Sequence, residues 1–396
     1  MLYTYGGSFQ GRSHIERKVV CQDSSINKIV EINGRKYAVL IAADGVGSAK
    51  HAEDGSRTAA EVCFDLIQNS KQLNEITLLD AYTAAFDAVT QLSNKEGNPI
   101  NDYDTTLSVA LLSEDGVLIY GHSGDGGIVG IKESGEYVAI TKPQKGPDGQ
   151  SVIPLRFGKD RWEFGTYDGH LSSVMVMTDG VLDVCVPSLL KDQRSQVYVP
   201  FVRFFSDNNV LDIDTNGIEA VSSSRMDFLN GEACSMITDD RTLLVAIDSS
   251  RNPNIMDESY YLEPDWEGLK EQWKRKAYPH LYNKNQDGMI NKASSSEKSS
   301  AVVDESNNCS DIPKDSKSED QSDSDSPESI KSETGAKMES DFSDGNQDTH
   351  TSSFPSENQL DHSGSQPSDP NNSSSDSTLQ RKGLFRSITK SLFDKK

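Results

Sequence analysis

An apolar run that ends on a carboxylate constrains the fold of this chain more than any other feature of its sequence. Residues 37–43 are all uncharged, and Asp44, Gly45 and Gly47 come after them. A run of this length predicts a β-strand that is buried on both faces, which requires layers of structure on each side. The glycines let the backbone turn and bring its carbonyl groups close to whatever Asp44 binds. On its own, the motif is more typical of an ordinary Asp-Gly turn.

The combination of an apolar stretch and an acid recurs along the chain. Asp179 follows the apolar residues 174–177, and Asp239 precedes the apolar residues 243–247. Asp23 stands ahead of the first run. Acids at several strand ends indicate a shared centre, and ligands that are all oxygen suit Mg²⁺ or Mn²⁺ better than zinc, which prefers Cys and His. The recurrence therefore predicts a site for hard divalent cations.

Turn signals and hydrophobic periodicity predict both strands and helices. Asn33 and Gly34 separate two strand-like stretches, a strong signal for a hairpin whose second strand contains the run 37–43. Apolar residues recur at helical spacing over residues 54–69 and 77–93, so two helices should pack as a layer on one face of a sheet.

Short strands separated by turn residues dominate the remainder of the first 250 residues. The stretch 105–140 predicts an antiparallel meander, the strand at 243–247 is expected to close the sheet, and a weakly marked strand is expected at 18–21. Helices are expected after Gly180 and at 217–229. The strands of this region are predicted at residues 105–112, 116–122, 127–131, 137–140, 162–166 and 174–177. This mixture favours an α+β domain.

The average composition, with 34% hydrophobic residues and a net charge of −23, hides two regimes. Residues 284–378 carry 7 Lys and no Arg against 20 Asp and Glu, and they have too few apolar side chains to offset their chain entropy. We therefore expect a folded domain at 1–250, a strap with a short helix at 251–283, a disordered acidic linker at 284–378 and a basic helix at 379–396.

The basic segment 379–396 is amphipathic if helical. It is predicted to dock on a protein partner or to lie on a membrane surface, and a merely solubilising chain end is the third interpretation. Its apolar residues are Leu384, Phe385, Ile388, Leu392 and Phe393.

Charge and cysteine usage limit the partners and the compartment. A sequence pI near 4.7 argues against nucleic acid as a partner, because phosphates would repel most of the surface. We see no targeting signal, and the longest apolar run is too short for a transmembrane segment. The five cysteines form no C-x-x-C motif, so reduced thiols in a cytoplasm are expected.

Six motifs, in this order, resemble those of the metal-dependent protein phosphatases of the 2C type. They are Gln22-Asp23, Asp44-Gly45-x-Gly47, Asp104-Thr105-Thr106, Gly124-Asp125, Thr178-Asp179-Gly180 with Asp183, and Asp239-Asp240-x-Thr242. Gly11-x-Ser13-His14 is most similar to a bacterial branch of that family. The resemblance covers roughly residues 8–250 and implies a central antiparallel β-sandwich flanked by helix pairs, in the order α-β-β-α.

The resemblance also implies a catalytic metal site. In this family a water that bridges two divalent cations, Mg²⁺ or Mn²⁺, hydrolyses phosphoserine and phosphothreonine in proteins. By matching motifs, Asp44 would bridge both ions and the Gly45 carbonyl would complete one coordination shell. Asp23, Asp179 and Asp239 would bind the ions directly or through waters.

Other matching positions are less decisive. Asp125 and Asp183 match the family's optional third ion, although Asp125 also fits a plain turn. Val46 stands where animal members carry a histidine that is thought to protonate the leaving group. Lys18 replaces an arginine that holds the phosphate in many members, and a lysine lacks the bidentate fork of arginine. His14 is a second candidate for phosphate binding.

Two functions from different classes follow. The first is a protein serine/threonine phosphatase that acts on a phosphorylated protein, with a serine/threonine kinase as a cognate partner. The alternative is a catalytically weak adaptor of the same family that recruits partners through its tail. The sequence does not decide between Mg²⁺ and Mn²⁺.

Overall fold

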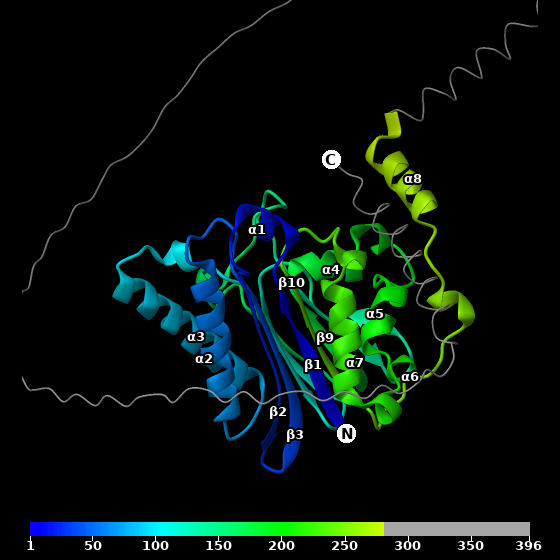
Figure 1. Cartoon of the computed structure of the whole chain (residues 1–396), viewed down its shortest axis with the longest axis horizontal. Coiled ribbons are helices and arrows are strands. Elements are labelled where there is room, and N and C mark those ends of the chain that lie inside the picture. Colours follow the sequence, from blue (N-terminus) through cyan, green and yellow to red (C-terminus); the bar gives the residue numbers. More distant parts are fainter. Residues whose placement is uncertain (281–396) are drawn as a thin grey trace, which may run out of the picture. The chain divides into compact units, whose positions relative to one another are not determined.

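Two five-stranded antiparallel sheets pack face to face in the computed structural model, which describes residues 1–280 apart from the side chains of 214–216 (Figure 1). The first sheet contains, in spatial order, β1 (Leu2–Phe9), β10 (Arg241–Asp248), β9 (Leu171–Met177), β6 (Gly127–Lys132) and β7 (Tyr137–Ala139). The second contains β2 (Asp23–Ile32), β3 (Arg35–Asp44), β4 (Leu107–Ser113), β5 (Leu118–Ser123) and β8 (Glu163–Tyr167). The predicted α+β class and the sandwich are confirmed.

The predicted hairpin joins β2 to β3. Asn33 and Gly34 adopt φ angles of 54° and 75°, the left-handed conformations that a two-residue hairpin turn of this kind requires. Pairing continues in register to the far end of the two strands, where Asp23 lies opposite Asp44. The turn thus brings two of the predicted metal ligands together.

Strand β3 is buried on both faces, as its apolar run predicts. Leu40 and Ala42 belong to the core between the two sheets, whereas Val39 and Ile41 face the helices on the outer side. Because side chains alternate along a strand, an unbroken apolar run serves two cores at once. The inter-sheet core consists of Leu2, Ala38, Leu40, Ala42, Ala110, Leu112, Leu118, Ile128, Leu171, Val174, Val176, Leu244 and Ala246.

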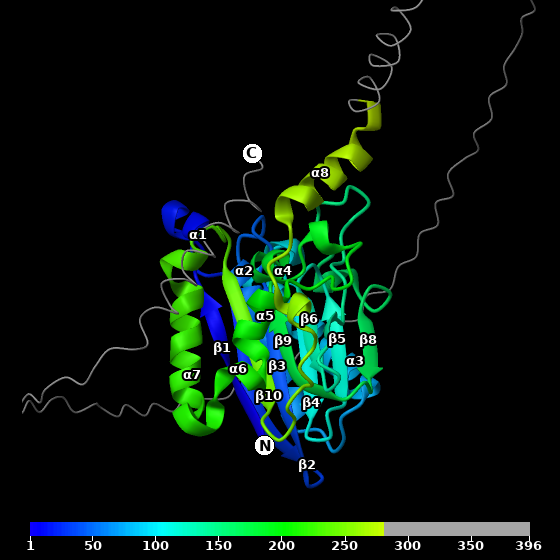
Figure 2. The ribbon, with the colours of Figure 1, turned by 90° about the vertical axis from the view of Figure 1, so that its right-hand side faces the viewer.

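Helices cover the outer face of each sheet. The two predicted helices, α2 (Ala52–Gln68) and α3 (Glu75–Glu96), pack on the second sheet, where the buried Tyr82 hydroxyl donates to the Leu107 carbonyl at 2.8 Å. Figure 2 shows the opposite side, where other helices lie over the first sheet. These are α4 (Asp179–Cys185), α5 (Val199–Ser206), α6 (Asn208–Leu211) and α7 (Ile213–Asn230).

The strand predicted at 18–21 is wrong. Helix α1 (Arg12–Arg17) comes directly before this stretch and is capped by Lys18, which has a φ of 59°, and residues 19–22 belong to no helix or strand. Two consecutive valines gave the strand signal, but the left-handed cap turns the chain before a strand can start. The chain instead begins with β1, whose two adjacent glycines weaken the strand signal, so the sequence pattern did not reveal it.

The four strands predicted for 105–140 are confirmed, but they do not form one meander. β4 pairs with β5, but β6 and β7 lie in the other sheet, so the chain crosses between the sheets at residues 124–126. Gly124 permits this crossing with a φ of 112°. Strand β10, which was expected to close the sheet, lies inside it between β1 and β9.

The strap after residue 250 contains α8 (Trp266–Ala277). Trp266 is buried against the core beneath the first sheet and meets the Tyr198 ring edge-on, with centroids 5.4 Å apart. Within residues 1–280, no helix has the length and apolar character needed to span a membrane. The predicted acidic linker 284–378 and basic helix 379–396 lie outside the described residues, and the domain boundaries stay predictions.

Candidate metal centre

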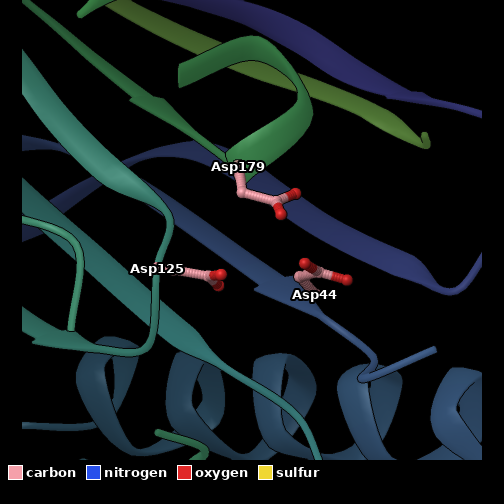
Figure 3. A group of neighbouring side chains, drawn as sticks. All are labelled: Asp44, Asp125 and Asp179. Atoms are coloured by element: carbon pink, nitrogen blue, oxygen red, sulfur yellow. The ribbon is translucent and has the colours of Figure 1, made fainter. Parts of the chain in front are cut away.

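Three carboxylates converge at one end of the sandwich. Asp44, Asp125 and Asp179 each offer an oxygen, and these atoms all lie within 4.8 Å of one another. Figure 3 shows their carboxylate groups facing a common space. Asp44 ends β3, Asp125 precedes β6 and Asp179 begins α4 directly after β9. The antiparallel pairing of β6 with β9 places Asp125 near Asp179, and the packing of the two sheets brings the end of β3 to the same place.

The Asp44 backbone is held by the Asp104-Thr105-Thr106 motif. The Thr106 hydroxyl accepts the Asp44 N–H at 2.9 Å, and the Thr106 N–H donates back to the Asp44 carbonyl at 2.8 Å. The Thr105 hydroxyl donates to the same carbonyl at 3.0 Å. These bonds fix the point at which Asp44 leaves the sheet.

Gly45 lets the chain pass close to helix α2. A Cβ atom at this position would lie 2.5 Å from the Ala52 carbonyl oxygen and 2.8 Å from the Ala52 Cβ. The helix start and the strand end therefore cannot accommodate any side chain here. The residue that follows Asp44 must be glycine for packing reasons, whatever its carbonyl binds.

Asp23 is buried and oriented by two hydroxyl groups. Its Oδ2 accepts hydrogen bonds from Thr178 at 2.9 Å and from Thr242 at 2.7 Å. Its other oxygen, Oδ1, is also buried and has no hydrogen-bond partner among residues 1–280. A buried carboxylate oxygen without a partner is costly, so this atom needs a cation or a proton. The same holds for Asp125 Oδ1.

Burial and mutual repulsion raise the pKa values of these acids. Burial raises the pKa of Asp23 to about 7, with the Asp240 charge adding to the effect and the two threonine hydroxyls opposing it. Burial, together with the charges of the neighbouring acids, raises the pKa of Asp179 to about 8 and that of Asp44 well above its usual range. Bound cations would relieve this repulsion, so an acidic, all-oxygen donor set of this kind fits Mg²⁺ or Mn²⁺.

Asp239 and Asp183 flank the three central acids. Asp239 is close enough that its charge raises the pKa values of Asp44 and Asp179, yet its side chain is 58% exposed. Asp183 lies one turn beyond Asp179 in α4, and burial raises its pKa. The structure therefore gathers Asp23, Asp44, Asp125, Asp179, Asp183 and Asp239 into one region.

The two candidate phosphate-binding residues occupy different environments. Lys18 is exposed at the end of α1. His14 is buried, with Nδ1 2.9 Å from Asp240 Oδ2 and Nε2 3.7 Å from Asp239 Oδ1. Phosphate binding by either residue stays a prediction.

Sequence reasoning missed several residues that shape the site. Asp240 appeared in a motif without a role. It is buried and accepts the backbone N–H groups of Gly11 and Gln22, both at 2.6 Å, which ties the start of β10 to the segments before and after α1. Thr178 and Thr242 appeared in the motifs, but their contacts with Asp23 depend on the tertiary fold. Lys145 had no sequence signal, and its Nζ lies 3.6 Å from Asp125 Oδ2.

One histidine, His122 in β5, makes contacts that stabilise the fold. His122 is fully buried, with Nδ1 3.0 Å from the Ser108 hydroxyl and Nε2 3.2 Å from the Lys142 carbonyl oxygen. Burial lowers its pKa to about 4, so it is neutral near pH 7. It holds β4, β5 and the loop after β7 together.

An α-β-β-α sandwich with carboxylates gathered at one end is the arrangement that the resemblance to the metal-dependent protein phosphatases implies. Residues 10–212 match the family described as Protein phosphatase 2C. Because this match spans about half of the sequence, the chain belongs to the protein phosphatase 2C family, and the resemblance predicted from the motifs is confirmed. The family is one of metal-dependent protein phosphatases.

Solved structures of bacterial phosphatases resemble the fold at low sequence identity. The serine/threonine phosphatase PstP/Ppp of Mycobacterium tuberculosis is 17% identical, with a TM-score of 0.41, 62% of this chain covered and 98% of that chain. Stp1 of Staphylococcus aureus is 14% identical, with a TM-score of 0.44 and coverages of 63% and 95%. The PstP catalytic domain with two manganese ions is 18% identical, with a TM-score of 0.43 and coverages of 62% and 97%. No curated protein sequence matches the chain.

Proposed function

We propose that this protein hydrolyses phosphoserine and phosphothreonine in proteins with the help of two divalent cations, Mg²⁺ or Mn²⁺. The observation that carries the proposal is the convergence of Asp44, Asp125 and Asp179 beside the unpartnered Oδ1 of Asp23. Family membership supports the same conclusion. Bound divalent cations would neutralise phosphoryl oxygens and lower the pKa of a water molecule into the neutral range.

The residues that would hold the two cations are those that the motifs predict. They are Asp44 with the Gly45 carbonyl, Asp23, Asp179 and Asp239. Asp125 and Asp183 would join Asp179 around a third ion. Lys18 would approach the phosphate as a point charge, and an exposed position at the end of α1 leaves it free to do so.

The Thr242 hydroxyl is expected to orient Asp23 for metal binding. Thr242→Val removes the hydroxyl that donates to Asp23 Oδ2 but keeps the shape of the side chain. We expect Mn²⁺ affinity to fall roughly 10- to 100-fold, the usual cost of removing a group that orients a metal ligand. Titration calorimetry with Mn²⁺ measures this effect. Thr242→Ser retains the hydroxyl and should bind nearly as the unaltered protein does; equal affinity in both variants would show that the hydroxyl does not orient Asp23.

The proposed activity is tested by phosphate release from a phosphoserine peptide and from p-nitrophenyl phosphate. We expect hydrolysis with Mn²⁺ that stops in EDTA and returns when Mn²⁺ is restored. Hydrolysis that is insensitive to EDTA would contradict the metal-dependent mechanism. If the protein binds no ion at millimolar Mn²⁺, the catalytically weak adaptor becomes the better proposal.

The partners follow from the same proposal. A serine/threonine phosphatase acts on a phosphorylated protein and opposes a serine/threonine kinase, while residues 379–396 would contact a protein or a membrane surface. Cys21, Cys63, Cys185 and Cys234 are free thiols, which supports the proposal of a reducing compartment such as the cytoplasm.

A further inference from the structure

Lys145 lies in a loop whose backbone is attached to the turn that carries Asp125. The Gln144 N–H donates to the Gly124 carbonyl at 2.7 Å, and the Gly124 N–H donates to the Gln144 side chain at 3.3 Å. Lys145 itself forms an isolated antiparallel bridge with Val152. These contacts fix the backbone of the loop beside the acidic cluster, so the place of Lys145 is set by the fold.

The ammonium group of Lys145 lies beside Asp125. Nζ is 3.6 Å from Asp125 Oδ2, whose side chain is only 7% exposed. The positive charge of Lys145 also acts on Asp183, where it opposes the rise in pKa that burial causes. Asp125 and Asp183 are the two residues that match the optional third ion.

The surroundings of Asp125 resemble those of a cation site. Asp125 Oδ1 is buried without a hydrogen-bond partner among residues 1–280, and an oxygen of Asp179 lies within 4.8 Å of an Asp125 oxygen. The ammonium group therefore approaches one member of the cluster formed by Asp44, Asp125 and Asp179. A single positive charge only partly balances them.

We propose that Lys145 acts as a tethered cation that competes with a third divalent ion for Asp125 and Asp183, so that this chain holds two ions tightly and the third weakly. The proposal rests on the proposed function, because it assumes that the neighbouring acids bind Mg²⁺ or Mn²⁺. The side chain of Lys145 is 38% exposed, so it can withdraw into solvent when a divalent ion displaces it. Lys145 and the third ion then compete for the same acids, and this competition can be measured as a difference in Mn²⁺ affinity between variants.

The experiment is a Mn²⁺ titration of the full chain and its variants. Binding is measured from the electron paramagnetic resonance signal of free Mn²⁺ and by calorimetry. Lys145→Met removes the charge and keeps the length of the side chain, and Lys145→Gln is a second variant that retains polarity. Lys159→Met is the matched control, since Lys159 is an exposed lysine of the same loop region. Circular dichroism checks that each variant is folded.

We expect the weakest of three Mn²⁺ sites to bind about tenfold more tightly in Lys145→Met and Lys145→Gln, because a like charge near the ion has been removed. The two tighter sites and the Lys159→Met control should change by less than about twofold. Adding Asp183→Asn to Lys145→Met should weaken the third site again.

Other results separate the failure of this inference from that of the proposed function. Two tight sites with an unchanged, weakened or absent third site in Lys145→Met would overturn the competition while leaving the two-ion proposal intact. An absence of Mn²⁺ binding in the unaltered protein and in every variant would overturn both.

Discussion

Replacing Asp44 by asparagine is expected to lower phosphate release about 10³-fold or more. Asp44 is the central acid of the cluster, and its charge is the one that would act on both cations. Losing such a ligand removes on the order of 4 kcal/mol of transition-state stabilisation. The rate of p-nitrophenyl phosphate hydrolysis with Mn²⁺ measures the effect.

The same substitution should leave the metal-free protein at least as stable as before. Asparagine is similar in size and removes a buried acid whose pKa is raised by burial and by the charges of Asp23 and Asp179 in the metal-free state. Asp80→Asn, on the exposed side of α3, is the control and should retain full activity. Full activity in Asp44→Asn would remove Asp44 from the mechanism, and a collapsed Tm would mean that the loss of activity reflects unfolding.

In the absence of divalent cations, stability is expected to fall as the pH rises from about 5 to about 8. The pKa of Asp23 in the folded protein is about 7 and that of Asp179 about 8, both above the ordinary value of 3.8. Between the ordinary value of 3.8 and these raised pKa values, the folded protein binds more protons than the unfolded chain does. By linkage, its free energy of unfolding therefore decreases with rising pH.

Adding Mn²⁺ should reverse most of this loss. An ion at 100 times its Kd stabilises the folded state by about 2.7 kcal/mol, which for a domain of this size raises the Tm by roughly 5–10 °C. Thermal unfolding in EDTA and in Mn²⁺, at pH 5.5, 7 and 8.5, measures both effects. The expected rise with Mn²⁺ is largest at pH 8.5, where the acids are ionised. A Tm in EDTA that does not change with pH would mean that these carboxylates are not crowded as the structure shows.

Local signals predicted the parts of the fold that local interactions build. The Asn33-Gly34 turn and the apolar run 37–43 predicted the β2–β3 hairpin, because residues adjacent in the sequence determine the turn type and the burial of the strand. The stripes at 54–69 and 77–93 gave α2 and α3 to within a few residues. The acids themselves were found through their place at strand ends.

Features that depend on the pairing of distant segments were not predictable in this way. The crossing of the chain between sheets at Gly124 separates strands that are neighbours in sequence, and no local pattern marks it. The approach of Lys145 to Asp125 likewise arises from hydrogen bonds across 20 residues, between Gly124 and Gln144. The burial of His14 against Asp240 joins residues from opposite ends of the domain.

The hairpin turn at Asn33 and Gly34 determines how Asp23 and Asp44 are placed at the far end of its two strands. Each arm of the hairpin is ten residues long, so the turn lies roughly 30 Å from the carboxylates that the arms carry. Inserting or deleting one residue there would slide the two arms past each other and send Asp23 to the opposite side of its strand. Surface loops usually tolerate changes in length, but in this protein a distant loop sets the spacing of two proposed ion ligands and is expected to keep its size.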